Sequence, residues 1–497
     1  MRFDIQRFEA EGNTLLAASE IEQALAPFRG RDKAFADLTQ AAEVLEETYH
    51  ARGYSAVQVL LPEQDITQGV VRLRVVEPRI GKVVVEGNTV FSTDNVRRSL
   101  PSVREGGFPN SLEMARELQL TAEHPTKQTT VMLRAGASED QVDMNVHVVD
   151  DKPWRTFLTL DNTGTGATGY ERLGIGYQHA NLFDRDHTFT AQYVTSPTNA
   201  SKVNIYGLGY RIPFYDWHSS LDLVAGYSDV NSGTVQGLFT VAGSGTVAGA
   251  HWNYYPTKWG DVEQKLSVGF DYRAFNNQVL FEGQGLVPDI TVHPVSATYY
   301  GVVRSAASEL SFNAGLAANL SGGSNGTAAD FQRSRPGATS RYTILHYGFT
   351  YLRQLPQGWQ ARALIGGQYT GNALVAGEQF GLGGADSVRG YMLREVVNDR
   401  GYAGQLELYT PELSSRFGLS DNYKMRLLAF YDSGSVKRNH ALPGEALGDS
   451  IGSVGFGARV GYGKSLSFRL DLASIQQPTA NRSTGSLRLG VAAAFMF

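Results

Sequence analysis

Two different spacings of apolar residues divide this chain of 497 residues. In the amino-terminal part, the run Asp37–Arg52 repeats apolar residues every third or fourth position, which predicts a helix with one buried face: Leu38, Ala41, Leu45 and Tyr49. From about Trp154 onward the helical spacing disappears, and successive runs alternate apolar with polar residues, as strands with two unlike faces do. The pattern therefore predicts an α+β amino-terminal part followed by an all-β part.

The amino-terminal part contains an internal repeat. The tetrapeptide EGNT occurs at Glu11–Thr14 and again at Glu86–Thr89, an offset of 75 residues, and the apolar positions that follow match in the same register. Each copy predicts a strand, two helices and two further strands. In the first copy these are a strand over Phe3–Glu11, then the two helices, then strands over Ala56–Leu61 and Val70–Val76. We predict two small β-α-α-β-β domains, residues 1–78 and 79–151.

The alternating runs of the second part fit either a water-soluble sandwich or a membrane barrel. In Leu266–Ala274 the apolar set would face a protein core in a sandwich but lipid in a barrel. The last run alternates as far as Phe497, and an apolar stripe on an unpaired strand would aggregate in water. This favours the barrel.

The connections between the runs favour the same choice. Short breaks such as Leu182–Asp186 and Leu355–Gly358 alternate with longer ones such as 321–340 and 377–400. Short turns on one side and long loops on the other are typical of outer-membrane barrels. We count about sixteen strands, and therefore predict a 16-stranded antiparallel transmembrane β-barrel over residues 152–497.

Composition excludes several classes of function. No window approaches 18 uncharged apolar residues, which excludes a membrane-spanning helix and an uncleaved signal peptide. The chain has no cysteine, so disulfides, thiol catalysis and cysteine metal sites are excluded. A net charge of -5 gives no reason to expect nucleic-acid binding. The ten histidines show no paired metal spacing and no Ser/His/Asp arrangement stands out, so we expect no enzyme, no metal and no cofactor.

One arginine stands in a glycine-rich loop, in the motif VRGY at Val388–Tyr391, and the motif FYDSG follows at Phe430–Gly434. By strand alternation, Phe430, Asp432 and Gly434 face away from the aliphatic side, so Asp432 points into the lumen. A carboxylate there could hold the Arg389 guanidinium by two parallel hydrogen bonds. The alternatives are a mobile surface charge for the arginine and a hydrated carboxylate for the aspartate. Glu407 fits either the same cluster or a surface position.

Along nearly its whole length the chain resembles the outer-membrane transporters of two-partner secretion, within the superfamily of outer-membrane assembly barrels. The resemblance lies in the paired EGNT repeats, VRGY, FYDSG and two longer segments, YHARGYSAVQVLLPEQDITQGVVRLRVVEP at Tyr49–Pro78 and LDNTGTGATGYERLGIGYQHANLFDRD at Leu160–Asp186. It implies two periplasmic POTRA domains before a 16-stranded barrel in the outer membrane of a Gram-negative cell. It also implies that the loop 377–400 folds into the lumen, where Arg389 pairs with Asp432.

The resemblance further implies transport without a cofactor. A large secreted exoprotein with an amino-terminal secretion domain would dock unfolded on the POTRA domains, pass through the barrel and fold outside. Family precedent points to a monomer in the lipid bilayer, inserted by the barrel assembly machinery through the strand that ends at Phe497. Family members usually carry an amino-terminal plug helix before the first POTRA domain, and the residues here predict none.

Docking of an extended chain needs an open strand edge beside an apolar groove. The sequence places these at Ala56–Leu61 and the neighbouring first helix, and the expected cargo-binding residues are Ile21, Leu25, Ala56, Val57, Val59 and Leu61. The alternative is a solvated strand that binds no cargo. Two other functions stay open at this point, an insertase for outer-membrane proteins and a passive porin.

Overall fold

The protein folds into two compact units. Its computed structural model describes residues 2–66, 68–166, 168–230, 233–235, 239–241, 244–276, 280–281, 284–285 and 288–497. One unit comprises Met1–Lys152 with the short segment Phe214–His218, and the other comprises Pro153–Pro213 with Ser219–Phe497. The change from helical to alternating periodicity near Trp154 coincides with the change from one unit to the other.

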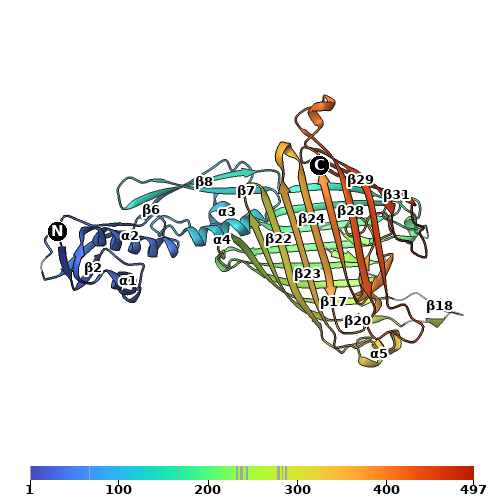
Figure 1. Cartoon of the computed structure of the whole chain (residues 1–497). Coiled ribbons are helices and arrows are strands. Elements are labelled where there is room, and N and C mark those ends of the chain that lie inside the picture. The colour runs from blue at the N-terminus through green and yellow to red at the C-terminus, as the bar shows by residue number, and fades with distance from the viewer. Residues whose placement is uncertain are drawn as a thin grey trace. The chain divides into compact units, whose positions relative to one another are not determined.

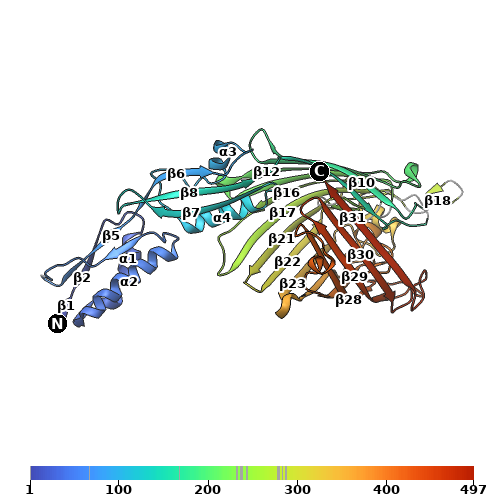
Figure 2. The same ribbon diagram turned by 90° about the horizontal axis from the view of Figure 1, so that it is seen from above.

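The first unit begins with a domain of two small sheets and two helices (Figure 2). Its main sheet has the order β2-β5-β4, and a separate pair joins β1 to β3. The elements are β1 (Arg2–Ile5), β2 (Arg7–Glu11), α1 (Ala18–Leu25), η1 (Ala26–Phe28), β3 (Gly30–Ala34), α2 (Phe35–Ala51), β4 (Gln58–Leu60) and β5 (Val70–Val76). As the spacing predicts, the buried face of α2 carries Leu38, Ala41, Leu45 and Tyr49.

The single first strand predicted over Phe3–Glu11 is wrong in one respect. The chain bends between β1 and β2, where the backbone N–H groups of Gln6 and Arg7 both donate to the carbonyl of Gly69. After this bend only β2 pairs with β5, while β1 pairs with β3. The two-stranded sheet of β1 and β3 is therefore an addition to the predicted β-α-α-β-β unit.

The second domain of this unit repeats the same order of elements without the added two-stranded sheet. Its sheet has the order β6-β8-β7 and its elements are β6 (Arg79–Glu86), α3 (Thr93–Arg98), α4 (Ser111–Ala122), β7 (Lys127–Ala135) and β8 (Gln141–Asp150). Met144, Val146 and Val148 of β8 are buried against the helices. Among the helices that the structure describes, none has the length and apolar character needed to cross a membrane.

The two EGNT segments form the same turn in both domains. Glu77, just after β5, accepts hydrogen bonds from the backbone of Thr14 and Leu15, while Asp150, at the end of β8, does the same for Thr89 and Val90. The glycines of the turns have φ of 92° and 84°, and an added Cβ would lie 2.4 Å and 2.3 Å from a carbonyl oxygen of the last strand. Both turns therefore require glycine at this position, because any side chain would clash with the last strand.

The second unit is a closed antiparallel barrel. Two pieces, β20 and β21, both pair with β17 and form one interrupted strand, so the described residues make sixteen strands. The strands are β9 (Trp154–Asp161), β10 (Arg172–Leu182), β11 (His187–Thr195), β12 (Ile205–Phe214), β13 (Ser219–Ser228), β16 (Gly245–Tyr254), β17 (Val262–Phe275), β20 (Ile290–Val292), β21 (Pro294–Arg304), β22 (Ser308–Asn319), β23 (Thr343–Gln354), β24 (Gln360–Tyr369), β27 (Arg400–Tyr409), β28 (Tyr423–Lys437), β29 (Gly448–Tyr462), β30 (Leu466–Ile475) and β31 (Leu487–Met496). Figure 1 shows β22, β23, β24, β28 and β29 side by side in the wall.

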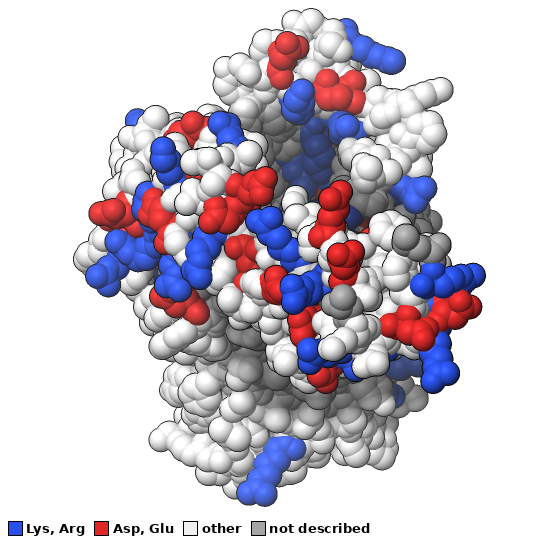
Figure 3. All heavy atoms as spheres, turned by 90° about the vertical axis from the view of Figure 1, so that its left-hand side faces the viewer, with Lys and Arg blue, Asp and Glu red and all other residues white. Residues whose placement is uncertain are grey.

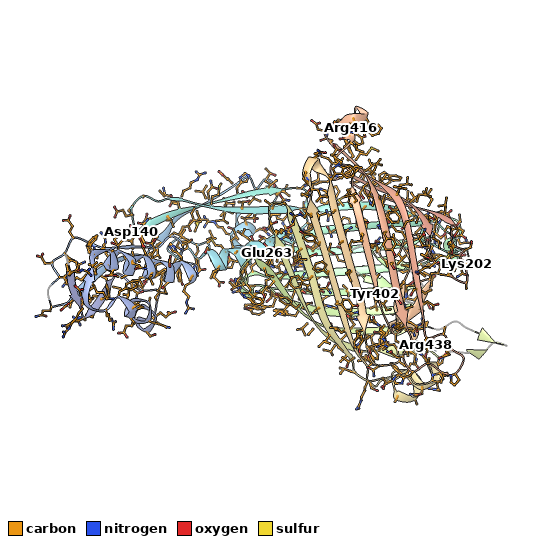
Figure 4. The ribbon with its side chains drawn as sticks, viewed as in Figure 1. Asp140, Lys202, Glu263, Tyr402, Arg416 and Arg438 are labelled. Atoms are coloured by element: carbon orange, nitrogen blue, oxygen red, sulfur yellow. The ribbon has the colours of Figure 1, made fainter. Side chains whose placement is uncertain are left out.

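The faces of the strands follow the predicted alternation. In β17 the apolar set is on the outer face, where Phe270 is 47% exposed, whereas Asp271 is buried toward the lumen. Short connections such as 183–186 and 463–465 lie at the barrel end that carries Glu263 and Arg416, although the connection 410–422 at this end is longer (Figure 4). The other end, which carries Lys202 and Arg438, has the longest loops, 320–342 and 370–399 (Figure 4). Basic and acidic side chains are interspersed on the molecular face in Figure 3, in keeping with the small net charge. The apolar outer face and polar lumen are those of a membrane barrel.

Candidate functional site in the barrel lumen

The connection between β24 and β27, residues 370–399, is here named the lumen loop. It contains the short helix η5 (Ala376–Glu378) and a pair of short strands, β25 (Phe380–Leu382) and β26 (Val396–Asn398). The VRGY motif lies between these two strands. Gly390 in the motif has φ of 92°, and a Cβ there would lie 3.1 Å from the Cβ of Ala473 on the barrel wall. The loop can approach the wall this closely because the residue is glycine.

Arg389 is buried against two strands of the wall. Its Nε and Nη2 donate to the two carboxylate oxygens of Asp432 at 2.7 Å and 2.6 Å, and its backbone N–H donates to the same carboxylate at 3.0 Å. Its Nη1 donates to Glu407 at 2.8 Å, and the guanidinium lies 3.7 Å from the ring centroid of Phe430. The arginine is 4% exposed and the aspartate 0%. Arg389, Asp432, Glu407 and Phe430 are named the anchor cluster.

Strand alternation explains the position of the wall residues. In β28, Leu427 and Tyr431 are exposed on the outer face, while Phe430 and Asp432 are buried on the lumen side. Gly434, two residues further on, leaves room for Leu382 of the lumen loop, whose Cδ2 would lie 2.8 Å from an added Cβ. The spacing of F-x-D-x-G therefore places an aromatic ring, a carboxylate and a glycine without a side chain on the lumen face of β28.

The rest of the VRGY motif packs on the neighbouring strands. Val388 is buried with Ile451 and Ile475 in one apolar cluster. The hydroxyl of Tyr391 lies 2.9 Å from the carbonyl oxygen of Gly452 and 2.6 Å from that of Gln477. Motif residues on both sides of the arginine therefore hold the loop to the wall formed by β28, β29 and β30.

Glu407 belongs to the lumen cluster and not to the surface. It also lies 3.3 Å from Arg362, and Tyr409 donates to it at 2.8 Å. The sequence left this position open, although the exposed Leu406 and Leu408 on either side mark it as a lumen residue. Sequence reasoning also missed Asp471 of β30, which lies 3.8 Å from Arg389.

A second contact holds the beginning of the lumen loop to another strand. Glu378 is buried and accepts from Nη1 of Arg273 in β17 at 3.1 Å. The same guanidinium donates to Asp271 at 2.8 Å, and Nε2 of His251 lies 2.9 Å from that aspartate. The loop is therefore tied at Glu378 and at Arg389 to strands on different sides of the barrel. Alternation in β17 marks Asp271 and Arg273 as lumen residues, but nothing in the sequence pairs them with the loop.

A third contact joins the lumen loop to two neighbouring outer loops. Asp399 is 0% exposed and accepts from Nη2 of Arg335 at 2.9 Å, from the backbone of Leu374 at 2.9 Å and from that of Asn439 at 2.7 Å. Burial alone would raise the pKa of Asp399, but the Arg335 guanidinium and the backbone N–H groups offset it and hold the pKa below its ordinary value. This carboxylate stays charged and links three loops. Among the described residues, no group of three His, Asp or Glu side chains is arranged to hold a metal ion.

The expected cargo-binding residues of the first domain lie differently from the prediction. Leu25, Val57 and Val59 are buried in the core of the domain, with Ile21 and Leu61 packed against it and Ala56 half-buried. Leu25, Val57 and Val59 therefore offer little surface to a cargo chain, whereas Ile21, Ala56 and Leu61 stay partly exposed, and cargo binding at these residues remains a prediction. The edge of β4 is also engaged, because the N–H of Val59 donates to Glu46 at 2.9 Å and the Val57 carbonyl lies 3.1 Å from Nε2 of His50. Strand addition at this edge would have to displace α2 side chains.

Comparisons with known proteins agree with the architecture. Residues 140–460 match the family described as haemolysin secretion/activation protein ShlB/FhaC/HecB, and residues 3–78 match the ShlB-type POTRA domain. The heme/hemopexin transporter protein HuxB of Haemophilus influenzae is 21% identical over 491 residues, which cover 94% of this chain and 82% of HuxB. The outer membrane transporter CdiB of Dickeya dadantii is 22% identical over 421 residues, 82% of this chain and 72% of CdiB. The structure of CdiB from Escherichia coli superimposes with a TM-score of 0.82 at 17% identity, over 100% of this chain and 91% of that one.

Proposed function

The chain belongs to the ShlB/FhaC/HecB family of haemolysin secretion/activation proteins, and from this premise we propose how it exports a partner protein. It is an outer-membrane transporter of two-partner secretion, with an amino-terminal POTRA domain and a 16-stranded barrel. The family assignment favours export over an insertase or a passive porin. As domain limits we propose residues 1–78 and 79–151 for two POTRA domains in the periplasm and 152–497 for the barrel.

The exoprotein is proposed to bind first to the amino-terminal domains as an extended, unfolded chain. An extended segment gains main-chain hydrogen bonds by adding to the edge of a sheet, whatever its sequence. Because the edge of β4 is engaged by α2, we assign this role to β7, an edge strand of the sheet β6-β8-β7. Its side chains Met132 and Leu133 are 44% and 43% exposed, so apolar cargo residues could pack beside the new strand.

The lumen loop is proposed to control passage through the barrel, and the observation that carries this is the buried anchor cluster. A guanidinium bound by two carboxylates and stacked on a ring fixes the loop inside the lumen, where an exported chain must pass. The cargo would fold outside the cell, and this folding would give the transport its direction. The closed barrel encloses its own lumen, so one copy of the chain is proposed to suffice, and no cofactor or enzymatic step is invoked.

The test is secretion of a partner exoprotein, chosen as a large secreted protein with an amino-terminal secretion domain. Co-expression with the intact transporter is expected to bring the exoprotein into the medium. Arg389→Ala is expected to reduce that amount sharply, because the loop loses its anchor. Arg416→Ala is the matched control, since this arginine is exposed in the connection 410–422, outside the lumen loop, and its removal should not affect export (Figure 4).

Heat-modifiable migration of the barrel shows that each variant has inserted and folded. If the exoprotein stays in the cell with the intact transporter, the proposed partnership is wrong. If Arg389→Ala exports as well as the intact protein, the anchor has no part in transport. A charge-swapped pair, Arg389→Asp with Asp432→Arg, tests the contact itself and is expected to restore part of the export.

A further inference from the structure

The lumen loop does not occupy the lumen evenly. Besides the anchor cluster, Asp386 lies 3.4 Å from Arg469 of β30, and a small space of about 50 Å³ lies between the VRGY segment, β30, β31 and residues 162–163 after β9. The loop is thus packed closely on the wall from β27 through β31 to β9. Any open passage beside the loop has to lie along other strands.

Such a space is present on the opposite side of the loop. A cavity of about 420 Å³ lies between residues 380–387 of the lumen loop and the strands β21, β22, β23, β24 and β27. Alternation identifies the side chains that enter it from the wall. Ile365 and Leu406 are exposed on the outer face, so Gly366 and Gln405 next to them face the lumen. Gly348 faces the lumen as well, because an added Cβ would lie 2.4 Å from Oδ1 of Asn313.

The wall of this cavity presents glycine, hydroxyl and amide groups together with larger uncharged side chains such as Tyr300 and Leu364. Paired neighbours across the strands bring Ser311 and Asn313 beside Thr350 and Gly348, and these lie beside Leu364 and Gly366. Among the lining residues that the structure describes, the charged one is Asp386, which belongs to the loop and not to the wall. The ion pairs of this part of the lumen are instead gathered at the anchor cluster.

We propose that this cavity, here named the glycine-lined path, is where an extended segment of the exported polypeptide crosses the barrel. The proposal rests on the export function proposed above. Packed strands advance ~3.3 Å per residue, lie ~4.8 Å apart and stack ~10 Å from the next layer, which gives about 160 Å³ per extended residue. A cavity of about 420 Å³ therefore holds roughly two to three residues of extended chain at a time.

The composition of the wall fits such a ligand. Gly366 leaves open space on the wall, since the nearest atom to an added Cβ there is 3.8 Å away, so a bulky cargo side chain can pass at that position. The hydroxyl of Ser311 and the amides of Asn313 and Gln405 can exchange hydrogen bonds with a passing peptide backbone without selecting a sequence. A neutral wall also avoids strong attraction to charged segments of the cargo.

Two glycines on adjacent strands give a matched test. Gly366 of β24 faces the path and Gly404 of β27 faces outward, and an added Cβ would have its nearest neighbour at 3.8 Å and 3.7 Å respectively. Gly366→Trp is expected to abolish most export of the co-expressed exoprotein, because an indole fills the path. Gly404→Trp places the same ring on the outer face, where aromatic residues are tolerated, and is expected to export like the intact protein.

A second measurement locates the cargo directly. The chain has no cysteine, so a single substitution gives one reactive thiol. The exoprotein that the intact transporter secretes is fused to a fast-folding domain that stalls it in the barrel, and its stalled segment carries a short thiol-reactive cross-linker. Asn313→Cys is expected to form the cross-link, and Thr190→Cys, on the lumen side of β11, is the control that should not.

The outcomes separate the two proposals. Failure of the intact transporter to secrete the exoprotein would count against the export partnership itself. Secretion by the intact transporter together with equal export by Gly366→Trp and Gly404→Trp would overturn the glycine-lined path and leave export standing. Cross-linking through Thr190→Cys in place of Asn313→Cys would move the path to the opposite wall and equally overturn the proposal.

Discussion

Removal of the Arg389 guanidinium is the perturbation with the largest expected effect on the lumen loop. The variant Arg389→Ala leaves Asp432 and Glu407 buried in the lumen without the cation that three side-chain hydrogen bonds now hold against them. Breaking a buried ion pair by removing one partner costs about 3–5 kcal/mol. If that cost falls on the inward position of the loop, the ratio of inward to released loop drops roughly 150- to 5,000-fold.

The assay is labelling of a single thiol in the loop. Val388→Cys is made in the cysteine-free chain, where the valine is 0% exposed, and a bulky maleimide reagent is added to the purified protein in detergent. Labelling is expected to be slow with Arg389 present and much faster with Arg389→Ala. Arg389→Lys keeps the positive charge but loses the planar guanidinium that forms two parallel hydrogen bonds, so its labelling rate is expected to lie between those of the parent and of Arg389→Ala.

Asp386→Ala provides the control for this measurement. Its carboxylate is 86% exposed and forms a 3.4 Å ion pair with Arg469, a contact that contributes about 0–1 kcal/mol. The labelling rate at position 388 should therefore change little. Equal labelling in Arg389→Ala and in the parent would show that the buried ion pair does not hold the loop, and the reasoning from burial would fail.

Three further predictions concern other charged groups. Glu378→Gln should free the beginning of the lumen loop from Arg273 and raise proteolytic cleavage of residues 370–380, with little change at position 388. Asp399→Asn should loosen the outer loops, which hydrogen exchange would show as faster exchange of their amides. Because the pKa of Asp399 is held below its ordinary value of 3.8, acid should loosen these loops in the wild type only below pH 3.8. Burial raises the pKa of Glu117 in α4 from 4.5 to about 7. Between these two pH values the folded second domain keeps a proton on Glu117 that the unfolded chain has lost, so the domain loses about 3 kcal/mol of stability as pH rises from 4.5 to 7. Glu117→Gln should remove this loss, seen as equal protection of α4 amides at pH 6 and 8 after correction for intrinsic exchange.

The barrel could be predicted from the sequence because its strands obey a strict period of two. That period placed the apolar set of β17 outside and put Asp432 on the lumen side, 43 residues from the arginine that it binds. Glu407 could have been assigned by the same rule, since Leu406 and Leu408 on either side are exposed. Contacts made by the lumen loop with β17 and with the outer loops could not be predicted, because irregular backbone has no period that fixes where its side chains point.

The contacts around the expected cargo edge of the first domain could not be predicted for a different reason. The sequence places an open strand edge at Ala56–Leu61 beside the helix that carries Ile21 and Leu25, but in a strand at the edge of a small sheet the inward side chains, here Val57 and Val59, belong to the domain core. The side chain of Glu46 then covers a backbone donor of that edge. A strand at the end of a sheet is open only when no helix side chain reaches its backbone, and the sequence does not give that distance.

The anchor cluster and the glycine-lined path are linked by the distribution of charge in the lumen. At a separation of 4 Å, two opposite charges near a protein surface attract by about 4 kcal/mol, and each such contact along a passage would hold a charged cargo segment and slow its transit. In this barrel Arg389 pairs with Asp432 and Glu407, and Arg362 balances the second carboxylate. The wall on the other side of the loop presents glycine, hydroxyl and amide groups beside uncharged larger side chains. The anchor thus removes charge from the side of the lumen that the polypeptide is proposed to use. Arg389→Ala should therefore impair export in two ways: the released loop enters the path, and the unpaired carboxylates attract charged segments of the cargo. The attraction by the carboxylates should weaken as the salt concentration rises, because salt screens it.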